Sequence, residues 1–188
     1  MQNPSNIILG IDPGTNVMGF GAIQVINNKI QLIDLGVINF KSKDTVYEKL
    51  GAVFTECRQL IDRFKPDTLA IESPFYGKNV QSMLKLGRAQ GVVIATAMAC
   101  GIEVFEYSPR KIKQSITGKG NADKEKVAAM LPFIIDAKIK PSKLDATDAL
   151  ATAVCHHLQA SQPKLQGKKF NNWAQFIKEN PEKLIGSK

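Results

Sequence analysis

Four acidic residues stand where a carboxylate is unusual. Asp12 and Glu72 each end a short apolar run, and Asp145 and Asp148 lie three residues apart in the helix-like segment LDATDALA. A carboxylate in a buried strand costs several kcal/mol unless a positive charge compensates it. No Lys or Arg lies within a few residues of Asp12 or Glu72. A metal ion is therefore the candidate compensator.

The chemistry of these side chains indicates the kind of metal. Carboxylate oxygens without a convincing set of His or Cys ligands favour Mg²⁺ or Mn²⁺ over zinc. Two acids at strand ends and an i, i+3 pair on one helix face are what a two-metal phosphodiester site requires. The pattern predicts two Mg²⁺ ions per site, with Mn²⁺ able to substitute. In this scheme Asp12 bridges both ions, Glu72 binds one, and Asp145 and Asp148 bind the other.

Each acid also has an ordinary structural explanation. Asp12 begins an Asp-Pro-Gly sequence, which is good turn chemistry. Glu72 could be a strand-end charge that reaches solvent, and Asp145 and Asp148 could be first-turn acids that complement the helix dipole. These alternatives stay open for each residue alone, but the combination of four favours a shared site.

The net charge of +8 is concentrated in one segment. Between Ser108 and Lys143 there are nine basic residues and three acidic ones, directly before the helix that carries Asp145. Such a segment is often only a solvated surface. Beside a carboxylate cluster it indicates contact with a phosphate backbone, and therefore a nucleic-acid substrate.

Length and composition set further limits. A chain of 188 residues with 44% hydrophobic residues fits one domain with an appendage. Cys57, Cys100 and Cys155 lack any pairing or metal-binding spacing, so we expect buried free thiols in a reducing cytosol. Residues Met1–Asn6 do not resemble a signal peptide, and the longest nearly apolar run, Gly91–Ile102, is too short for a membrane span.

Hydrophobic periodicity predicts the element order β-β-β-α-β-α-β-α-α-α. The expected strands are Ile7–Asp12, Gly19–Ile26, Ile30–Phe40, Leu69–Glu72 and Ile102–Tyr107. The expected helices are one between an Asp44 cap and Pro66, then Val80–Cys100, Arg110–Ile116, Lys124–Leu131 and Leu144–Leu158. The first helix has an apolar face formed by Tyr47, Leu50, Val53, Phe54, Cys57, Leu60, Ile61 and Phe64. Antiparallel strands followed by crossovers predict an α/β fold with a mixed five-stranded sheet and helices on both faces.

Residues 1–160 are expected to form this domain, and residues 161–188 a linker and a tail. The segment SQPKLQGKK has the composition of a linker, and Asn171–Lys178 has the pattern of a short helix with Trp173, Phe176 and Ile177. The sequence assigns no role to this tail.

Five motifs resemble those of the RuvC family of bacterial Holliday-junction resolvases. In order they are GIDPGT, AIESPFYGKN, LKLGRAQG, VFEYSPRKIKQSITGKG and DATDALA, and they cover Ile7 to about Leu158. The resemblance implies an RNase H-like fold, a cytoplasmic homodimer and no membrane association. It also implies metal-dependent nicking of two strands of a four-way junction in DNA recombination and repair, together with the RuvA–RuvB branch-migration complex.

The resemblance extends to single residues. Asp12, Glu72, Asp145 and Asp148 match the four catalytic acids of the family. Phe75 would stack on a base unpaired at the crossover, a contact worth ~1–3 kcal/mol, although an aromatic pair in this loop could also plug the local core. The implied DNA contacts are Phe75, Tyr76 and Lys78 in this loop, Lys113 and Lys124 in the basic segment, and Arg110, Lys111 and Lys119 as auxiliaries.

A possible dimer interface lies in the helix expected at Val80–Cys100. Gly87 and Gly91 share one face, with Met83 and Leu84 nearby. Because a mid-helix glycine costs ~1 kcal/mol relative to alanine, the pair needs a reason. The glycines could allow close packing against the protein's own sheet, or the approach of a second copy across a two-fold axis. The resemblance implies the second arrangement.

Three other functions would each account for part of this pattern. DPGT near the amino terminus resembles the first phosphate loop of actin-like ATPases, but the chain has one lobe's length and lacks a second DGG-type loop. A junction-binding protein without catalysis would be expected to lose acids, and all four are present. An RNase H that cuts hybrids would share the fold, but the aromatic loop and the basic segment favour junction DNA.

Overall fold

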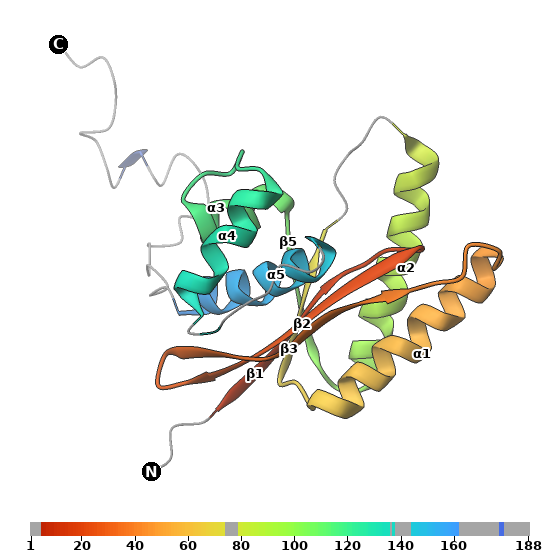
Figure 1. The fold of residues 1–188 in the computed structure, drawn as a ribbon, viewed down its shortest axis with the longest axis horizontal. Helices are drawn as coiled ribbons and strands as arrows, with labels where there is room; N and C mark the ends of the chain where they lie inside the picture. Colours follow the sequence, from red (N-terminus) through yellow and green to blue (C-terminus); the bar gives the residue numbers. More distant parts are fainter. Residues whose placement is uncertain (1–4, 74–78, 136, 138–143, 162–176, 179–188) are drawn as a thin grey trace.

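A five-stranded mixed sheet forms the centre of the molecule, with helices on both faces (Figure 1). This computed structural model describes residues 5–73, 79–135, 137, 144–161 and 177–178. The strands are β1 (Asn6–Asp12), β2 (Val17–Ile26), β3 (Lys29–Asn39), β4 (Thr68–Glu72) and β5 (Glu103–Tyr107). They stand in the order β3-β2-β1-β4-β5, with β1–β2 and β2–β3 antiparallel and β1–β4 and β4–β5 parallel. The predicted sheet and element order are confirmed.

The β2–β3 hairpin is closed by the two residues Asn27 and Asn28. Both adopt positive φ, 51° and 63°, the conformation that a two-residue hairpin turn requires and that Asn tolerates better than most residues. β3 begins at Lys29, one residue before the expected strand Ile30–Phe40.

Five helices complete the described fold: α1 (Val46–Phe64), α2 (Val80–Ala99), α3 (Pro109–Thr117), α4 (Lys124–Ile134) and α5 (Leu144–Ala160). Helices α1 and α2 pack on one face of the sheet, and α3, α4 and α5 pack on the other (Figure 1). No helix in the described part of the chain is long and apolar enough to cross a membrane. Of the predicted tail helix, only Ile177 and Lys178 are described, and both are helical.

The start of α1 differs from the prediction. Its cap is Thr45 rather than Asp44: the Glu48 backbone N–H donates to Thr45 Oγ1 (3.3 Å), and the Thr45 backbone N–H donates to Glu48 Oε2 (2.7 Å). This reciprocal pair is a capping box, which satisfies two backbone donors with one Thr–Glu spacing. The spacing is visible in the sequence and outweighs the isolated Asp44.

The apolar face of α1 is narrower than predicted. Val53, Cys57, Leu60, Ile61 and Phe64 are buried, as expected. In contrast, Tyr47 is 83% exposed and Phe54 is 50% exposed. The apolar residues of α1 therefore spread over more of the helix surface than the rest of the protein covers.

The cysteines agree with the prediction in part. Cys57 and Cys155 are buried free thiols, but Cys100 is only partly buried.

Candidate active site

Asp12 and Glu72 end neighbouring strands at the same edge of the sheet. β1 and β4 are parallel, with Ile11 paired to Ile71, so the next residue on each strand is one of the two acids. The carboxyl ends of parallel strands are where α/β folds commonly place their ligands. The pairing of β1 with β4 therefore places the two acids side by side.

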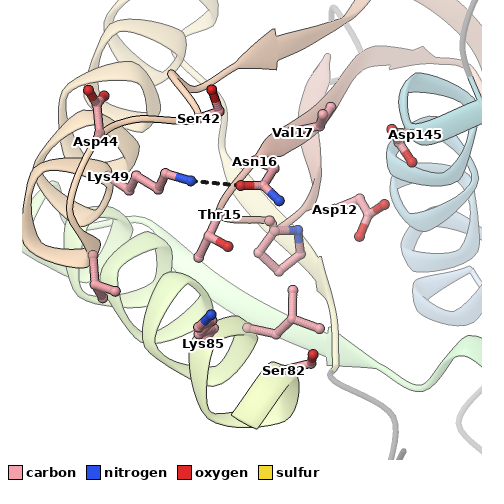
Figure 2. A pocket seen from close by; sticks show the side chains of 14 residues that line it. Asp12, Thr15, Asn16, Val17, Ser42, Asp44, Lys49, Ser82, Lys85 and Asp145 are labelled. Atoms are coloured by element: carbon pink, nitrogen blue, oxygen red, sulfur yellow. Dashed lines mark hydrogen bonds between the residues drawn. The ribbon is translucent and has the colours of Figure 1, made fainter. Parts of the chain in front are cut away.

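Helix α5 adds two more acids to this edge. Asp12, Asp145 and Asp148 each offer a carboxylate oxygen, and these three oxygens lie within 4.8 Å of one another. Figure 2 shows Asp145 on α5 facing Asp12. Glu72 is not a member of this group, although its pKa responds to the charges of Asp12 and Asp148.

Glycines on β1 and β2 allow α5 to reach these positions. A Cβ atom added at Gly10 would lie 2.1 Å from the Ala149 carbonyl oxygen, and one at Gly19 would lie 2.1 Å from the Asp145 carbonyl oxygen. At Gly21 it would lie 2.6 Å from Leu150 Cα. Any larger residue would push the helix away from the sheet, because such distances are far inside van der Waals contact.

Sequence reasoning missed these glycines. A signal was present, because Gly19 and Gly21 are two residues apart in β2 and therefore point to one face of the sheet. The helix that packs on this face is rich in alanine, with Ala146, Ala149 and Ala153 buried. Small residues on both sides indicate a close approach of helix and sheet.

The two strand-end acids lie in an environment that disfavours their charge. Burial, followed by the negative charge of Asp148, raises the pKa of Asp12 to about 7, with Lys124 opposing the shift. Burial, followed by the charges of Asp12 and Asp148, likewise raises the pKa of Glu72 to about 7. The site concentrates more negative charge than its surroundings stabilise, and the atoms it offers to a metal ion are carboxylate oxygens. It therefore fits a hard divalent cation.

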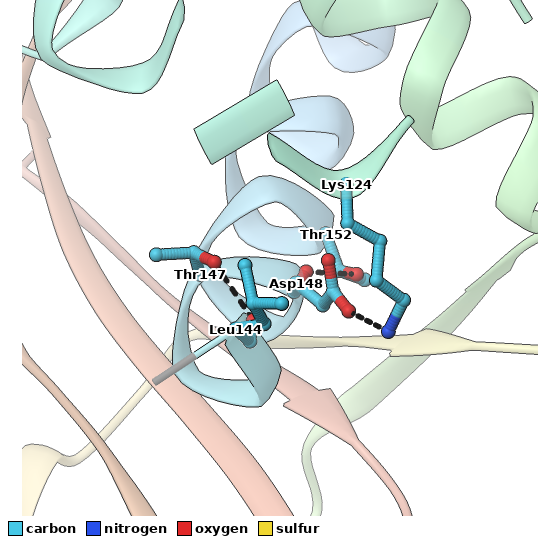
Figure 3. Close-up of polar contacts among 5 residues, drawn as sticks. All are labelled: Lys124, Leu144, Thr147, Asp148 and Thr152. Carbon is cyan, nitrogen blue, oxygen red and sulfur yellow. Dashed lines mark hydrogen bonds and ion pairs between the residues drawn. The ribbon is translucent and has the colours of Figure 1, made fainter. Parts of the chain in front are cut away.

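One lysine already pairs with the acid cluster. Lys124 Nζ donates to Asp148 Oδ2 (Figure 3). Burial lowers the pKa of Lys124, but the hydrogen bond and the attraction to the nearby carboxylates outweigh this effect, so the pKa is raised overall. The sequence indicated a metal ion as the candidate compensator of Asp12 and Glu72, because neither has a basic neighbour along the chain. The fold adds Lys124, a neighbour in space whose charge acts to lower the pKa of both acids.

The predicted DNA-contact residues fall into three groups. Lys113 on α3 and Lys124 on α4 line a small pocket together with Glu72 and Asp148. The auxiliaries do not line this pocket: Arg110 and Lys111 lie on α3, and Lys119 lies between α3 and α4. The third group, which comprises Phe75, Tyr76 and Lys78, lies outside the described residues.

The face of α2 that carries Gly87 and Gly91 is open. A Cβ atom at either glycine would meet nothing within 4 Å among the described atoms. Leu84 is 52% exposed on the same helix, and Met83 is partly buried. The alternative that these glycines allow close packing on the protein's own sheet is therefore wrong.

A larger groove adjoins the acids on the side of α1 and α2. It has a volume of about 650 Å³, and Asp12 and Asp145 lie at one end of it (Figure 2).

The sheet order, the helices on both faces and the carboxylates at the ends of β1 and β4 together define an RNase H-like nuclease fold.

Comparison with known proteins identifies the family. Residues 8–156 match the family model described as crossover junction endodeoxyribonuclease RuvC. The RuvC of Cytophaga hutchinsonii is 53% identical over 178 residues, which cover 95% of this chain and 88% of that protein. The RuvC of Porphyromonas gingivalis is 49% identical over 189 residues, which cover 98% of this chain and 100% of that protein. The structure of Thermus thermophilus RuvC in complex with a Holliday junction substrate has a TM-score of 0.74 at 29% identity, covering 82% of this chain and 94% of that one.

The chain belongs to the RuvC family of crossover junction endodeoxyribonucleases. It is thus a nuclease, and the sequence-based identification of the family is confirmed.

Proposed function

We propose that the protein resolves four-way DNA junctions by hydrolysing one phosphodiester bond in each of two opposing strands. The observation that carries this proposal is the convergence of Asp12, Asp145 and Asp148, whose oxygens lie within 4.8 Å at the end of β1, beside Glu72 on β4. Membership of the RuvC family supports it, as does the likeness to a relative whose structure contains a Holliday junction.

The proposed site holds two divalent cations, Mg²⁺ by preference and Mn²⁺ as a substitute. Asp12, Asp145 and Asp148 would hold one ion, and Asp12 with Glu72 would hold the other. When bound, the two ions neutralise charge on the attacking and leaving oxygens and make the attacking water more acidic. The separation of Glu72 from the group of three supports a division of the acids between two ions.

Lys124 has a distinct place in this proposal. Its ammonium pairs with the same Asp148 carboxylate that would bind a cation. A cation held by Asp148 would compete with Lys124 for this carboxylate, and the Lys124 ammonium would then be available for a DNA phosphate. Lys113 lines the same pocket, and Arg110, Lys111 and Lys119 extend the basic surface along α3 and the loop after it. Phe75, Tyr76 and Lys78 are proposed to contact the opened crossover on grounds of family resemblance.

The proposed enzyme acts as a homodimer formed through α2. Val80, Leu84 and Met98 are 64%, 52% and 67% exposed on this helix, and Gly87 and Gly91 leave its surface open. Two equivalent cuts in a four-way junction require two equivalent sites, which a two-fold interface provides. Cytoplasmic location, cooperation with a RuvA–RuvB complex and a nuclease domain of residues 1–160 with a separate tail rest on the family resemblance and the sequence.

The direct test is a cleavage assay on three substrates of matched sequence. A synthetic four-way junction, a linear duplex and an RNA–DNA hybrid are each incubated with the protein, with Mg²⁺ or with EDTA. We expect symmetric nicks in opposing strands of the junction, in the Mg²⁺ samples only. Preferential cutting of the hybrid would favour an RNase H activity, and the absence of cutting on all three substrates would contradict the proposal.

A further inference from the structure

The groove beside Asp12 and Asp145 has no role in the function proposed so far. It runs from these two acids along the β1–β2 loop to the first turns of α1 and α2 (Figure 2). Away from the acids its wall is mixed: apolar residues such as Val46 and Leu86 alternate with the hydroxyl-bearing residues Thr15, Ser42 and Ser82. A groove of this kind, continuous with the proposed site of hydrolysis, can hold the substrate next to the bond that is cut.

Two lysines supply positive charge to this groove. Lys49 Nζ donates to Asn16 Oδ1 at 2.7 Å, which holds the ammonium of α1 over the β1–β2 loop (Figure 2). Lys85 lines the groove from α2. It has no hydrogen bond or ion pair with any residue in the described part of the chain. An ammonium without a partner among the described residues, in a groove that also contains hydroxyl donors, is suited to bind a phosphate.

The charge of the groove depends on the acid cluster. The cations of the proposed site would neutralise the carboxylates of Asp12 and Asp145. Of the remaining charged residues, Lys49 and Lys85 outnumber Asp44, which lies at the end away from Asp12 (Figure 2). The groove is therefore net positive when the proposed site is loaded, as phosphate binding requires.

The acids lie between two basic surfaces. Lys113 and Lys124 meet Glu72 and Asp148 in the small pocket beneath α3 and α4, whereas the groove meets Asp12 and Asp145 beside α1 and α2. These helix pairs cover opposite faces of the sheet. Basic side chains therefore lie on both sides of the acids, Lys113 and Lys124 on one and Lys49 and Lys85 on the other.

We propose that this groove binds the backbone of the cleaved strand on the side of the scissile phosphate opposite to Lys113, with Lys85 and Lys49 as phosphate contacts. The proposal rests on the proposed junction-cutting function and adds the path of the strand through the site. The ligand is the sugar–phosphate backbone, so these contacts are independent of base sequence.

The first test removes one charge from the groove. Lys85→Gln is compared with Lys29→Gln, which removes an exposed lysine at the hairpin end of the sheet, away from Asp12. For Lys85→Gln we expect roughly tenfold weaker junction binding and a salt slope reduced by about 0.9. The melting temperature should not change, and nicking at a subsaturating junction concentration should slow in proportion to the lost affinity. Identical binding and salt slopes in the two variants would overturn the proposal.

The second test locates the phosphates. Neutral methylphosphonates replace single phosphates on both sides of the cut in the junction, and wild-type, Lys85→Gln and Lys113→Gln proteins are assayed with Mg²⁺. A methylphosphonate at a contacted phosphate should slow nicking by the wild type but not by the variant that already lacks the contact. We expect Lys85→Gln to become insensitive to a methylphosphonate on one side of the cut, and Lys113→Gln to one on the other side. Loss on the same side, or no loss for Lys85→Gln, would refute the groove proposal. Failure of the wild type to cut the unmodified junction would instead refute the proposed function.

Discussion

Gly19 of β2 lies directly beneath Asp145 of α5. A Cβ atom at position 19 would fall 2.1 Å from the Asp145 carbonyl oxygen, so only a glycine permits the helix to lie where it does. The same helix turn carries the Asp145 and Asp148 side chains to Asp12. The absence of a side chain at one residue of the sheet thus determines the position of two acids of the proposed site.

Replacing Gly19 with alanine should displace the start of α5. Overpacking of this kind typically costs ~1–3 kcal/mol, and displacement of the acids should lower the nicking rate more than the stability loss explains. Gly51→Ala on α1 is the control, because a Cβ atom there would meet none of the described atoms within 4 Å. This substitution should raise the free energy of unfolding by up to ~1 kcal/mol. Chemical denaturation and single-turnover nicking measure the two effects. A Gly19→Ala protein as stable and active as the wild type would contradict the close packing.

The metal-free protein should lose stability as the pH rises. The pKa of Asp12 is raised from 3.8 to about 7 in the folded protein, so between these values the folded state binds more protons than the unfolded state. Stability from this group is present below pH ~4 and is lost as the pH rises through ~7. Glu72 acts in the same direction, because burial and the neighbouring acids raise its pKa to about 7.

Thermal unfolding in EDTA and in Mg²⁺ checks this prediction. We expect a lower melting temperature in EDTA at about pH 8 than at about pH 5.5, and a larger gain from Mg²⁺ at the higher pH. Asp12→Asn removes one of the titrating groups and should reduce the loss in EDTA. If the wild type and Asp12→Asn showed the same pH dependence of the melting temperature, the pKa of Asp12 would not be raised in the folded protein.

Lys124→Gln should increase the affinity of the DNA-free protein for divalent cations. The substitution removes the partner of Asp148 and one positive charge near Asp12 and Glu72, so a cation meets less competition. Lys126→Gln is a matched control, because Lys126 pairs with the exposed Asp123 on the same helix. Calorimetric titration with Mn²⁺ should show severalfold tighter binding for Lys124→Gln and no change for Lys126→Gln. Equal or weaker binding by Lys124→Gln would argue against competition at Asp148.

Gly91→Leu should produce a folded monomer. The described residues leave this position open, so a leucine can be accommodated there, but it would block a second copy from approaching α2 closely. Sedimentation analysis should show half the wild-type mass, and junction nicks should no longer be paired in opposing strands. A fully active dimer would place the interface elsewhere, and an unfolded product would mean that α2 packs more closely within the chain than the structure shows.

The local sequence patterns specified the architecture well. Apolar runs that end in Asp12 and Glu72, the two asparagines of the hairpin and the long amphipathic helices each depend on short-range spacing, which sequence reveals directly. The convergence of Asp12 with Asp145 and Asp148 was inferred from residue type, and the structure brings these three together.

Features that depend on packing across the fold were harder to predict. The Lys124–Asp148 pair joins residues 24 apart, and the contact of Gly19 with Asp145 joins β2 to a helix far along the chain. The exposure of Tyr47 and Phe54 depends on what covers α1, which periodicity alone does not contain. The groove with Lys49 and Lys85 likewise forms only when α1 and α2 are placed beside the β1–β2 loop.

Single-turnover nicking of a four-way junction by Asp12→Asn tests most directly whether the acid cluster performs the hydrolysis. The assay uses protein in excess and Mg²⁺, and junction binding is measured in parallel. Asp12 should hold both cations, so we predict that the nicking rate falls by a factor on the order of 10³ or more. Junction binding should be nearly unchanged, because it depends on contacts to the phosphate backbone. A variant that retains a tenth of the wild-type rate while binding normally would contradict the assignment of Asp12 and the site built around it.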